Sequence, residues 1–232
     1  MPLKLIYHPL SPYSRKVYVL ALELNLASEI TLDKVVVAPV YYPGWSDNNS
    51  DVAAAGNPIA KIPTLVVDDF PGRDGGSVGI FDSKFICEYL LQRAGIKEDQ
   101  SSKRYWQEKA VHAASDGITD AEILVIYEER LREEKGLKWQ PWVDGQREKV
   151  MRGFDFLEKM AGEGVIGVKT GDEKVSLAEV AAAVCLSFFD ARQVDWRKGR
   201  SELEKFYQSW EKRESFVRAV STREADWKRP KL

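Results

Sequence analysis

The sequence predicts an α/β domain followed by an all-α domain, and three observations support that prediction. Up to about residue 93, short β-type runs alternate with helical runs, which is typical of a small layered α/β domain. The polar segment 94–102 (AGIKEDQSS) is expected to be a linker. Beyond it, strand signals nearly vanish and long amphipathic runs take their place. We therefore expect an α/β domain over residues 1–93 and a helical bundle over residues 103–232.

Each element of the first half has its own signal. The run LKLIY reads as a first strand, and the next run carries Val17, Leu20 and Leu24 at helical spacing. ITLDKVVV alternates like a second strand, and the later elements complete the order βαβ and then ββα. The expected strands are Leu3–Tyr7, 30–37, Thr64–Val67 and 77–81, and the expected helices are 14–24, 51–55 and 82–93.

Glycine separates the helical runs of the second half. Gly136 comes after the first run, and a cluster of four glycines between residues 162 and 171 comes after the second. The expected helices are 103–135, 141–160, 176–192 and 202–220.

The composition argues against several classes of function. There are 34 basic and 36 acidic residues, which give a net charge of -2, so electrostatics do not favour nucleic acid or an anionic membrane. No stretch is apolar and long enough to span a bilayer, and the N-terminus lacks the zones of a secretory signal. We therefore expect a cytoplasmic protein.

Cysteine and histidine are scarce. Cys87 and Cys185 each lie inside an apolar helical pattern, so we expect buried, reduced thiols. His8 and His112 are the only histidines. A metal site or a Ser-His-Asp site is therefore poorly supplied with ligands and bases, and we expect no metal.

The stretch HPLSPYSRKV lies where a dithiol enzyme would carry C-x-x-C, with serine at both cysteine positions, Ser11 and Ser14. Ser11 is well placed to cap the helix after it, and Pro12 favours a turn or a first helical position. The simplest interpretation is plain capping. The functional interpretation is that a helix start with a free hydroxyl favours an anion.

The stretch GNPIAKIPTL precedes the third strand. Pro63 marks the start of that strand because proline cannot donate a ladder hydrogen bond. A cis Ile62–Pro63 bond would expose the backbone N–H and C=O of Ile62 to an extended peptide ligand. The alternative is an ordinary trans proline in a loop.

The stretch IFDSKFI opens the third helix. Asp82 reads as the N-cap and Ser83 as the first helical residue. Plain capping is again the simpler alternative. The functional interpretation is that Ser83 and the free helix N–H groups bind a ligand carboxylate while Asp82 pairs with an ammonium group.

In this order and spacing, the three stretches resemble the cytosolic glutathione transferase superfamily. The resemblance extends over nearly the whole chain and includes Ser176-Leu177-Ala178-Glu179, which is similar to the family's capping box with glutamate in place of aspartate. The SPYS turn is most similar to serine-type members, including tau-like, fungal and bacterial ones.

The resemblance implies a thioredoxin-like domain that binds glutathione as co-substrate and a helical domain that shapes the site for a hydrophobic electrophile, in a homodimer. By position, Ser11 is the catalytic hydroxyl, and Tyr7 and Ser14 are the other candidates. The residues implied in glutathione binding are Ser11, Lys61, Ile62, Pro63, Asp82 and Ser83. The candidates for the electrophile site, on the first long helix of the second half, are Trp106, His112, Ala113, Asp116 and Tyr127.

The implied activity is conjugation of the glutathione sulfur to electrophiles, the chemistry of detoxification. Serine at position 11 argues against thiol-disulfide exchange through a protein-bound mixed disulfide. A glutathione-dependent isomerase or ether-cleaving enzyme would use the same thiolate. A glutathione-binding regulatory protein with the same fold and little turnover is the alternative outside enzymes.

Overall fold

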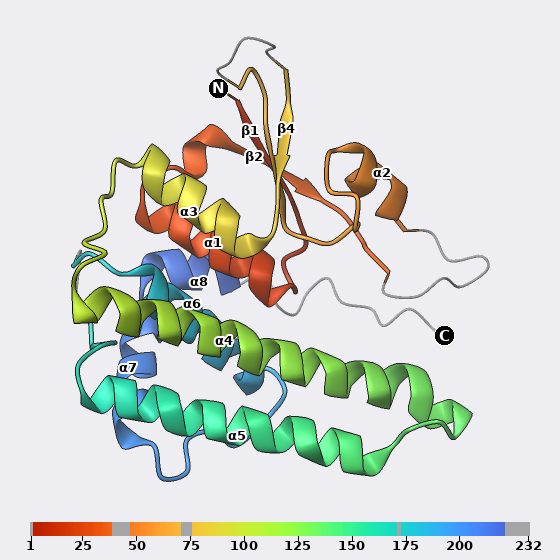
Figure 1. The fold of residues 1–232 in the computed structure, drawn as a ribbon, viewed down its shortest axis with the longest axis vertical. Helices are drawn as coiled ribbons and strands as arrows, with labels where there is room; N and C mark the ends of the chain where they lie inside the picture. Colours follow the sequence, from red (N-terminus) through yellow and green to blue (C-terminus); the bar gives the residue numbers. More distant parts are fainter. Residues whose placement is uncertain (1, 39–46, 71–75, 171–172, 221–232) are drawn as a thin grey trace. The chain divides into compact units, whose positions relative to one another are not determined.

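The computed structural model describes residues 2–38, 47–70, 76–170 and 173–220 (Figure 1). Contacts divide the chain into two compact units, residues 98–213 and residues 1–97 with the segment from Glu214 onward. The first unit has the thioredoxin-like order of elements, and the second is helical, so the expected fold class is confirmed. Residues 39–46 and 71–75, in the two long loops of the first half, lie outside the described residues, as do residues 221–232.

The first unit is built on a four-stranded mixed sheet with strand order β2-β1-β3-β4. β1 pairs with β2 in parallel and with β3 in antiparallel, and β3 pairs with β4 in antiparallel. Figure 1 shows α1 and α3 together on one side of this sheet and α2 on the other. The strands are β1 (Leu3–Tyr7), β2 (Ile30–Lys34), β3 (Thr64–Val67) and β4 (Val78–Ile80), and the helices are α1 (Pro12–Glu23), α2 (Asn49–Ala54) and α3 (Ser83–Arg93).

β2 is shorter than the strand expected over residues 30–37. The backbone N–H of Val36 donates to Asn48 Oδ1 at 2.9 Å, and that of Ala38 donates to Asn49 Oδ1 at 3.0 Å. The strand ends at Lys34 because its partner β1 ends at Tyr7, and beyond that pair asparagine side chains take up backbone donors of the chain.

Each face of the sheet has its own core. Ile6, Val35, Val52 and Val66 form a buried cluster on the side of α2, with Ile62 packed against it. Leu3 and Leu5, which alternate with Ile6 along β1, are also buried and point to the opposite face, where α1 and α3 lie.

Both cysteines lie in the interior of their own unit. Cys87 is on α3 and Cys185 is in the helical unit, and each is a buried thiol outside any disulfide. The expectation of buried, reduced thiols is therefore confirmed.

A C-terminal helix completes the first unit. α8 (Glu214–Val220) packs against α1, with Phe216 and Ala219 buried, and Ser215 Oγ donates to the Glu23 carboxylate. From the sequence, this segment was expected to be the end of one helix over residues 202–220 in the second half of the fold, whereas the structure breaks that run after Glu211. The expected domain limits of 1–93 and 103–232, with a linker between them, otherwise stay a prediction.

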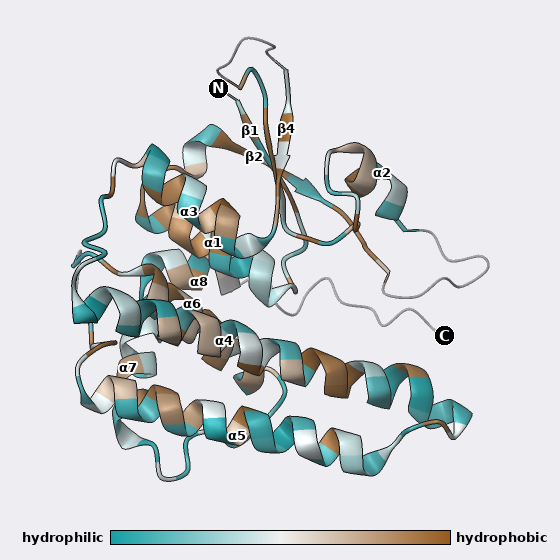
Figure 2. Ribbon diagram, in the orientation of Figure 1, coloured by the Kyte–Doolittle hydropathy of each residue, from teal (hydrophilic) through white to brown (hydrophobic). Residues whose placement is uncertain are grey.

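The second unit is a bundle in which α4 packs against α5 and α6, and α7 packs against α5 and α6. Hydrophobic and hydrophilic residues alternate along α5 (Figure 2), as an amphipathic helix requires. α6 is buried along almost its whole length. The bundle helices are α4 (Lys103–Tyr127), α5 (Gln140–Gly162), α6 (Leu177–Asp190) and α7 (Ser201–Glu211).

The run expected as one helix over residues 103–135 is α-helical only as far as Tyr127. A π-helical turn, Glu128–Arg132, and a short 3-10 turn, Glu133–Lys135, complete it. Gly136, with φ 65°, then ends the helix in the left-handed conformation that glycine adopts readily.

Candidate functional site

Three turns of the first unit meet at one end of the sheet. Ile6 pairs with Thr64 at the end of β1 and the start of β3, and Leu65 pairs with Ile80 at the end of β4. The turn after β1, the turn before β3 and the start of α3 after β4 therefore share this edge. They carry all the residues that the family resemblance implies in glutathione binding.

The first turn places Ser11 as the N-cap of α1, as expected. Its Oγ accepts from the backbone N–H of Ser14 at 3.3 Å, and its own N–H donates to the His8 carbonyl at 3.0 Å. Within the described residues, no acceptor takes the Ser11 hydroxyl hydrogen. Ser11 is half-buried, and the first turn of α1 contains no acidic residue. A polarised hydroxyl at a helix start is thus free to donate to an anion.

The two rival hydroxyls lie in different environments. Ser14 is fully buried, and its Oγ accepts from the His8 N–H at 3.4 Å, so it holds the turn together. Burial raises the pKa of the Tyr7 phenol, Tyr18 adds to the rise, and Lys34 opposes it. The Tyr7 phenol therefore stays neutral, and of the two serine hydroxyls Ser11 is the more accessible.

The second turn has a cis peptide bond between Ile62 and Pro63. No hydrogen bond from the described part of the chain engages the N–H or C=O of Ile62. Lys61 is exposed, and Pro63 is buried against the start of β3. The turn thus offers a donor and an acceptor of the main chain, beside a cation.

The third turn places Asp82 as the N-cap of α3. Asp82 Oδ1 accepts from the backbone N–H of Lys84 at 2.8 Å, and Asp82 is exposed whereas Ser83 is buried. The Phe81–Asp82 peptide bond is cis. A carboxylate and several free helix N–H groups are therefore adjacent at the start of this helix.

The expected electrophile residues all lie on α4, in the second unit. Trp106, with 62% of its surface exposed, Ala113 and Tyr127 are exposed. His112 is only 4% exposed, and its Nε2 lies 3.2 Å from Asp116 Oδ2 one turn along the helix. The structure therefore brings these two together, and it leaves the other three on the helix surface.

A small cavity adjoins His112. It has a volume of about 10 Å³ and is lined by His112, Lys109, Glu98, Glu108 and two residues of α6. That volume suits a single water molecule. Within the described residues of the second unit, this cavity beside His112 is too small for an organic substrate, and the burial of His112 with its contact to Asp116 favours a structural role for it.

Asn57 is a polar residue whose role was not predicted from the sequence. It is 1% exposed, and its Nδ2 donates to the Lys61 carbonyl at 2.7 Å and to Thr64 Oγ1 at 2.8 Å. In the sequence, Asn57-Pro58 reads only as a turn signal. The sequence feature that could have indicated a buried structural role is the position of this asparagine shortly before the buried strand that starts at Thr64.

The described residues form no recognisable metal site. Among them, no group of three or more His, Cys, Asp or Glu side chains is arranged to hold a metal ion. No helix that the structure describes combines the length and apolar character needed to cross a membrane.

Comparison with solved structures identified several similar chains. A glutathione transferase family member from Pseudomonas fluorescens Pf-5, crystallised with bound glutathione, is 29% identical, with a TM-score of 0.75 over 94% of this chain and 98% of that one. A glutathione S-transferase from Methylobacillus flagellatus KT with glutathione bound is 28% identical, with a TM-score of 0.70 over the same shares of the two chains. A glutathione transferase from Populus trichocarpa, 17% identical with a TM-score of 0.64 over 94% of this chain and 98% of that one, shares the fold.

Comparison with family descriptions gives the same result. The chain matches the glutathione S-transferase N-terminal domain over residues 10–93 and the C-terminal domain over residues 140–209, together more than half of its length. A search of curated proteins found no match. By its sequence in both halves and by its fold, the chain belongs to the glutathione transferase superfamily.

Proposed function

We propose that this protein is a serine-type glutathione transferase: it binds glutathione, stabilises its thiolate with the Ser11 hydroxyl and conjugates the sulfur to hydrophobic electrophiles. The observation that carries the proposal is the state of Ser11. Its oxygen accepts a helix N–H while its hydrogen remains available, at the sheet edge where the other two turns also end. The related proteins from Pseudomonas fluorescens and Methylobacillus flagellatus that were crystallised with glutathione support the choice of ligand.

Each turn then receives one part of the tripeptide. The cysteinyl unit pairs with the backbone N–H and C=O of Ile62, beside Pro63, because the described part of the chain leaves both groups unused. Lys61 reaches the glycine carboxylate. The γ-glutamyl end lies at the start of α3, where Ser83 and the helix N–H groups bind its carboxylate and Asp82 binds its ammonium group.

The energies required are compatible with one serine. A thiol with a pKa of about 8.5 is only a few per cent ionised at neutral pH, and lowering that pKa by about two units takes roughly 2.7 kcal/mol. A hydroxyl hydrogen bond to an anion contributes about 1.5 to 3 kcal/mol, and a helix N-terminus adds about 0.3 to 1 kcal/mol. Ser11 therefore acts as a donor to the attacking sulfur and is not itself the nucleophile.

The test is Ser11→Ala, assayed with glutathione and 1-chloro-2,4-dinitrobenzene. The loss of one hydrogen bond to a thiolate predicts a fall in kcat/KM of about 10- to 150-fold and a higher pKa of the bound thiol, measured from its ultraviolet absorbance.

Ser102→Ala is the control, because Ser102 also caps a helix: its Oγ accepts from the Tyr105 N–H at 3.1 Å, while its hydroxyl donates to the Asp99 carbonyl at 2.9 Å. This variant removes a cap together with that second hydrogen bond and is expected to keep full activity. Full activity and an unchanged thiol pKa in Ser11→Ala would refute the proposed role of Ser11.

The wild-type protein distinguishes the other functions. Binding of glutathione without turnover of any electrophile would indicate a glutathione-binding regulatory protein. Turnover limited to isomerisation or ether cleavage would indicate the other thiolate chemistries. Absence of glutathione binding would overturn the proposal as a whole.

The electrophile residues and the dimer also stay proposals. Trp106, Ala113 and Tyr127 are proposed to contact the electrophile, since they are exposed on α4. Asp116, on the same helix, is proposed to lie beside them while it also contacts His112. Trp106→Ala should then raise the KM for the electrophile and leave that for glutathione unchanged. Light scattering coupled to gel filtration tests the proposed homodimer.

A further inference from the structure

The segment that leads to Ile62 is organised around one buried side chain. The Asn57 amide uses all of its hydrogen-bonding groups on this segment: Oδ1 accepts from the Ile59 N–H at 3.3 Å, and Nδ2 donates to the Lys61 carbonyl at 2.7 Å and to Thr64 Oγ1 at 2.8 Å. The backbone carbonyl of Asn57 accepts from the Ala60 N–H at 2.9 Å. Asn57 is therefore hydrogen-bonded to residues along the whole turn, from Ile59 to Thr64.

Thr64 closes the same cluster. Its hydroxyl is fully buried, accepts from Asn57 and donates to the Lys61 carbonyl at 3.1 Å. The carbonyl of Lys61 thus receives two hydrogen bonds from groups on opposite sides of the cis Ile62–Pro63 bond. Because Lys61 immediately precedes Ile62, the orientation of this peptide unit sets the direction of the Ile62 N–H.

The cluster is also tied to the sheet. The Asn57 N–H donates to the Val52 carbonyl of α2 at 3.3 Å, and Thr64 begins β3. A Cβ on Gly79 would lie 2.7 Å from the Ala55 carbonyl oxygen, so β4 runs in close contact with the segment that leads into Asn57. The amide therefore connects α2, β3 and the turn between them.

We propose that Asn57 is a positioning residue for glutathione: by holding the Lys61 carbonyl and the Thr64 hydroxyl, it keeps the backbone of Ile62 oriented to pair with the cysteinyl unit. This rests on the proposed glutathione site. Asn57 is buried, so it acts on the ligand only through the peptide that it holds. Preorganisation of this kind raises affinity because the ordering of the turn does not have to accompany binding.

Removal of the amide has a specific expected effect. In Asn57→Ala the Lys61 carbonyl loses a partner, and in Asn57→Asp two donors become acceptors that face the oxygens of Lys61 and Thr64. Both variants are expected to raise the KM and Kd for glutathione by about tenfold or more, corresponding to roughly 1.4 kcal/mol or more. The KM for 1-chloro-2,4-dinitrobenzene should stay within about twofold, because the residues proposed to contact the electrophile lie on α4 and none of them is in this turn.

Thr64 supplies milder variants in case Asn57 is required for folding. Thr64→Val removes the hydroxyl with almost no change of shape and should weaken glutathione binding by about three- to tenfold, whereas Thr64→Ser should restore it. Thr119→Val is the matched control, since Thr119 is equally buried and donates to the Ser115 carbonyl at 2.8 Å within α4. It should lower stability without changing the Kd for glutathione.

The experiment is isothermal titration of each variant with glutathione, together with steady-state kinetics and thermal unfolding. A rise in the Kd for glutathione in the Asn57 or Thr64→Val variants, with an unchanged electrophile KM and wild-type affinity in Thr119→Val, supports the proposal. Folded Asn57 or Thr64→Val variants with wild-type affinity overturn it, as does an equal rise in both KM values. Failure of the wild-type protein to bind glutathione refutes instead the proposed function on which this inference rests.

Discussion

Two serine-capped helices, α1 and α6, begin with the same local arrangement and differ at the third residue of the helix. Ser11 Oγ accepts from the N–H of Ser14 at 3.3 Å, and Ser176 Oγ accepts from that of Glu179 at 3.2 Å. At α6 the third residue is a glutamate, whose carboxylate accepts from the Ser176 N–H at 2.8 Å. At α1 the third residue is Ser14, which binds His8 instead.

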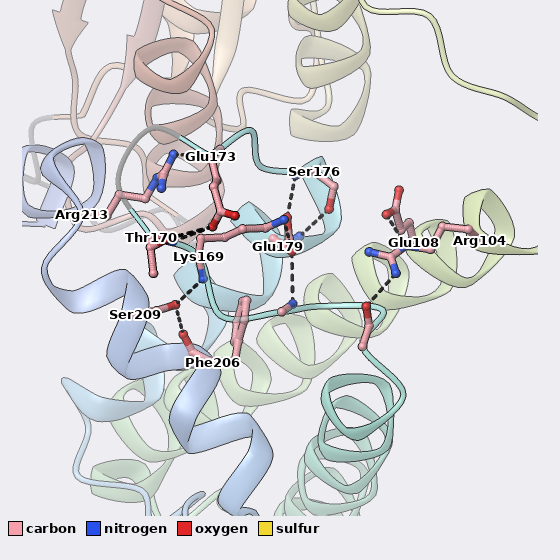
Figure 3. A network of polar contacts seen from close by, with 12 residues as sticks. Arg104, Glu108, Lys169, Thr170, Glu173, Ser176, Glu179, Phe206, Ser209 and Arg213 are labelled. Carbon is pink, nitrogen blue, oxygen red and sulfur yellow. Dashed lines mark hydrogen bonds and ion pairs between the residues drawn. The ribbon is translucent and has the colours of Figure 1, made fainter.

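The α6 capping box is also closed by its surroundings (Figure 3). Glu179 is 1% exposed, and its Oε1 accepts from the Gly167 N–H at 3.2 Å and lies 3.4 Å from Lys169 Nζ. One carboxylate therefore ties the loop between α5 and α6 to the start of α6. A serine cap is thus closed to an anion where a buried carboxylate lies in the first turn of its helix, as at α6. The cap of α1, whose first turn contains no acidic residue, stays open.

The largest effect on stability is expected when the closed box is opened. Glu179→Ala removes the reciprocal cap, the bond to Gly167 and the partner of Lys169, and should lower the free energy of unfolding by about 3 kcal/mol, measured by urea denaturation. The activity of the folded fraction should be unchanged. Glu148→Ala is the control. It removes an exposed ion pair, in which Glu148 Oε2 lies 3.6 Å from Arg152 Nη1, and should change the free energy of unfolding by less than about 0.5 kcal/mol. A loss below about 1 kcal/mol in Glu179→Ala would mean that the box does not hold this loop.

The direct comparison is between the two cap serines. Ser176→Ala and Ser11→Ala should each cost about 1 kcal/mol of stability, because each leaves one helix N–H without its partner. Only Ser11→Ala should lose activity. Paired urea denaturation and conjugation assays measure both quantities, and an equal loss of activity in Ser176→Ala would contradict the distinction between closed and open caps.

A second carboxylate, that of Glu122 on α4, is also buried. Burial raises the pKa of Glu122, although Arg192 and Arg147 oppose the rise. The folded protein therefore binds this proton more tightly than the unfolded chain, and stability falls as the pH rises from the ordinary glutamate value of about 4.3 through the raised one. Glu122→Gln should thus raise Tm at pH 8, with the difference shrinking toward pH 4. A Tm difference independent of pH would contradict this.

The smallest effect is expected at Tyr7. Tyr7 is the last residue of β1, four residues before Ser11, but the pKa of its hydroxyl is raised, chiefly by burial, so it is not poised to ionise. Tyr7→Phe should change kcat/KM by less than about threefold, an effect below that of one hydrogen bond to a thiolate. A loss as large as that of Ser11→Ala would transfer the catalytic role to Tyr7.

Much of the fold could be predicted because its signals are local. The caps Ser11, Asp82 and Ser176 with Glu179 act on groups two or three residues away, so residue type and spacing predicted them correctly. The predicted end of β2 was wrong by three residues, because it depends on where the partner strand β1 ends, at Tyr7, more than twenty positions earlier. The roles given to the site residues stay predictions.

The order of elements, the helix starts and the family are all written in short-range patterns of the sequence. The tertiary structure decided that the three turns share one edge of the sheet, that α8 packs against α1, and that Asn57 is buried with both amide hydrogens used. The physical reason is the range of the interactions. Ser11 as an N-cap depends on residues three positions away, whereas its place at the same edge of the sheet as the turns of Ile62 and Asp82 depends on strand pairings between residues about 15 to 60 positions apart.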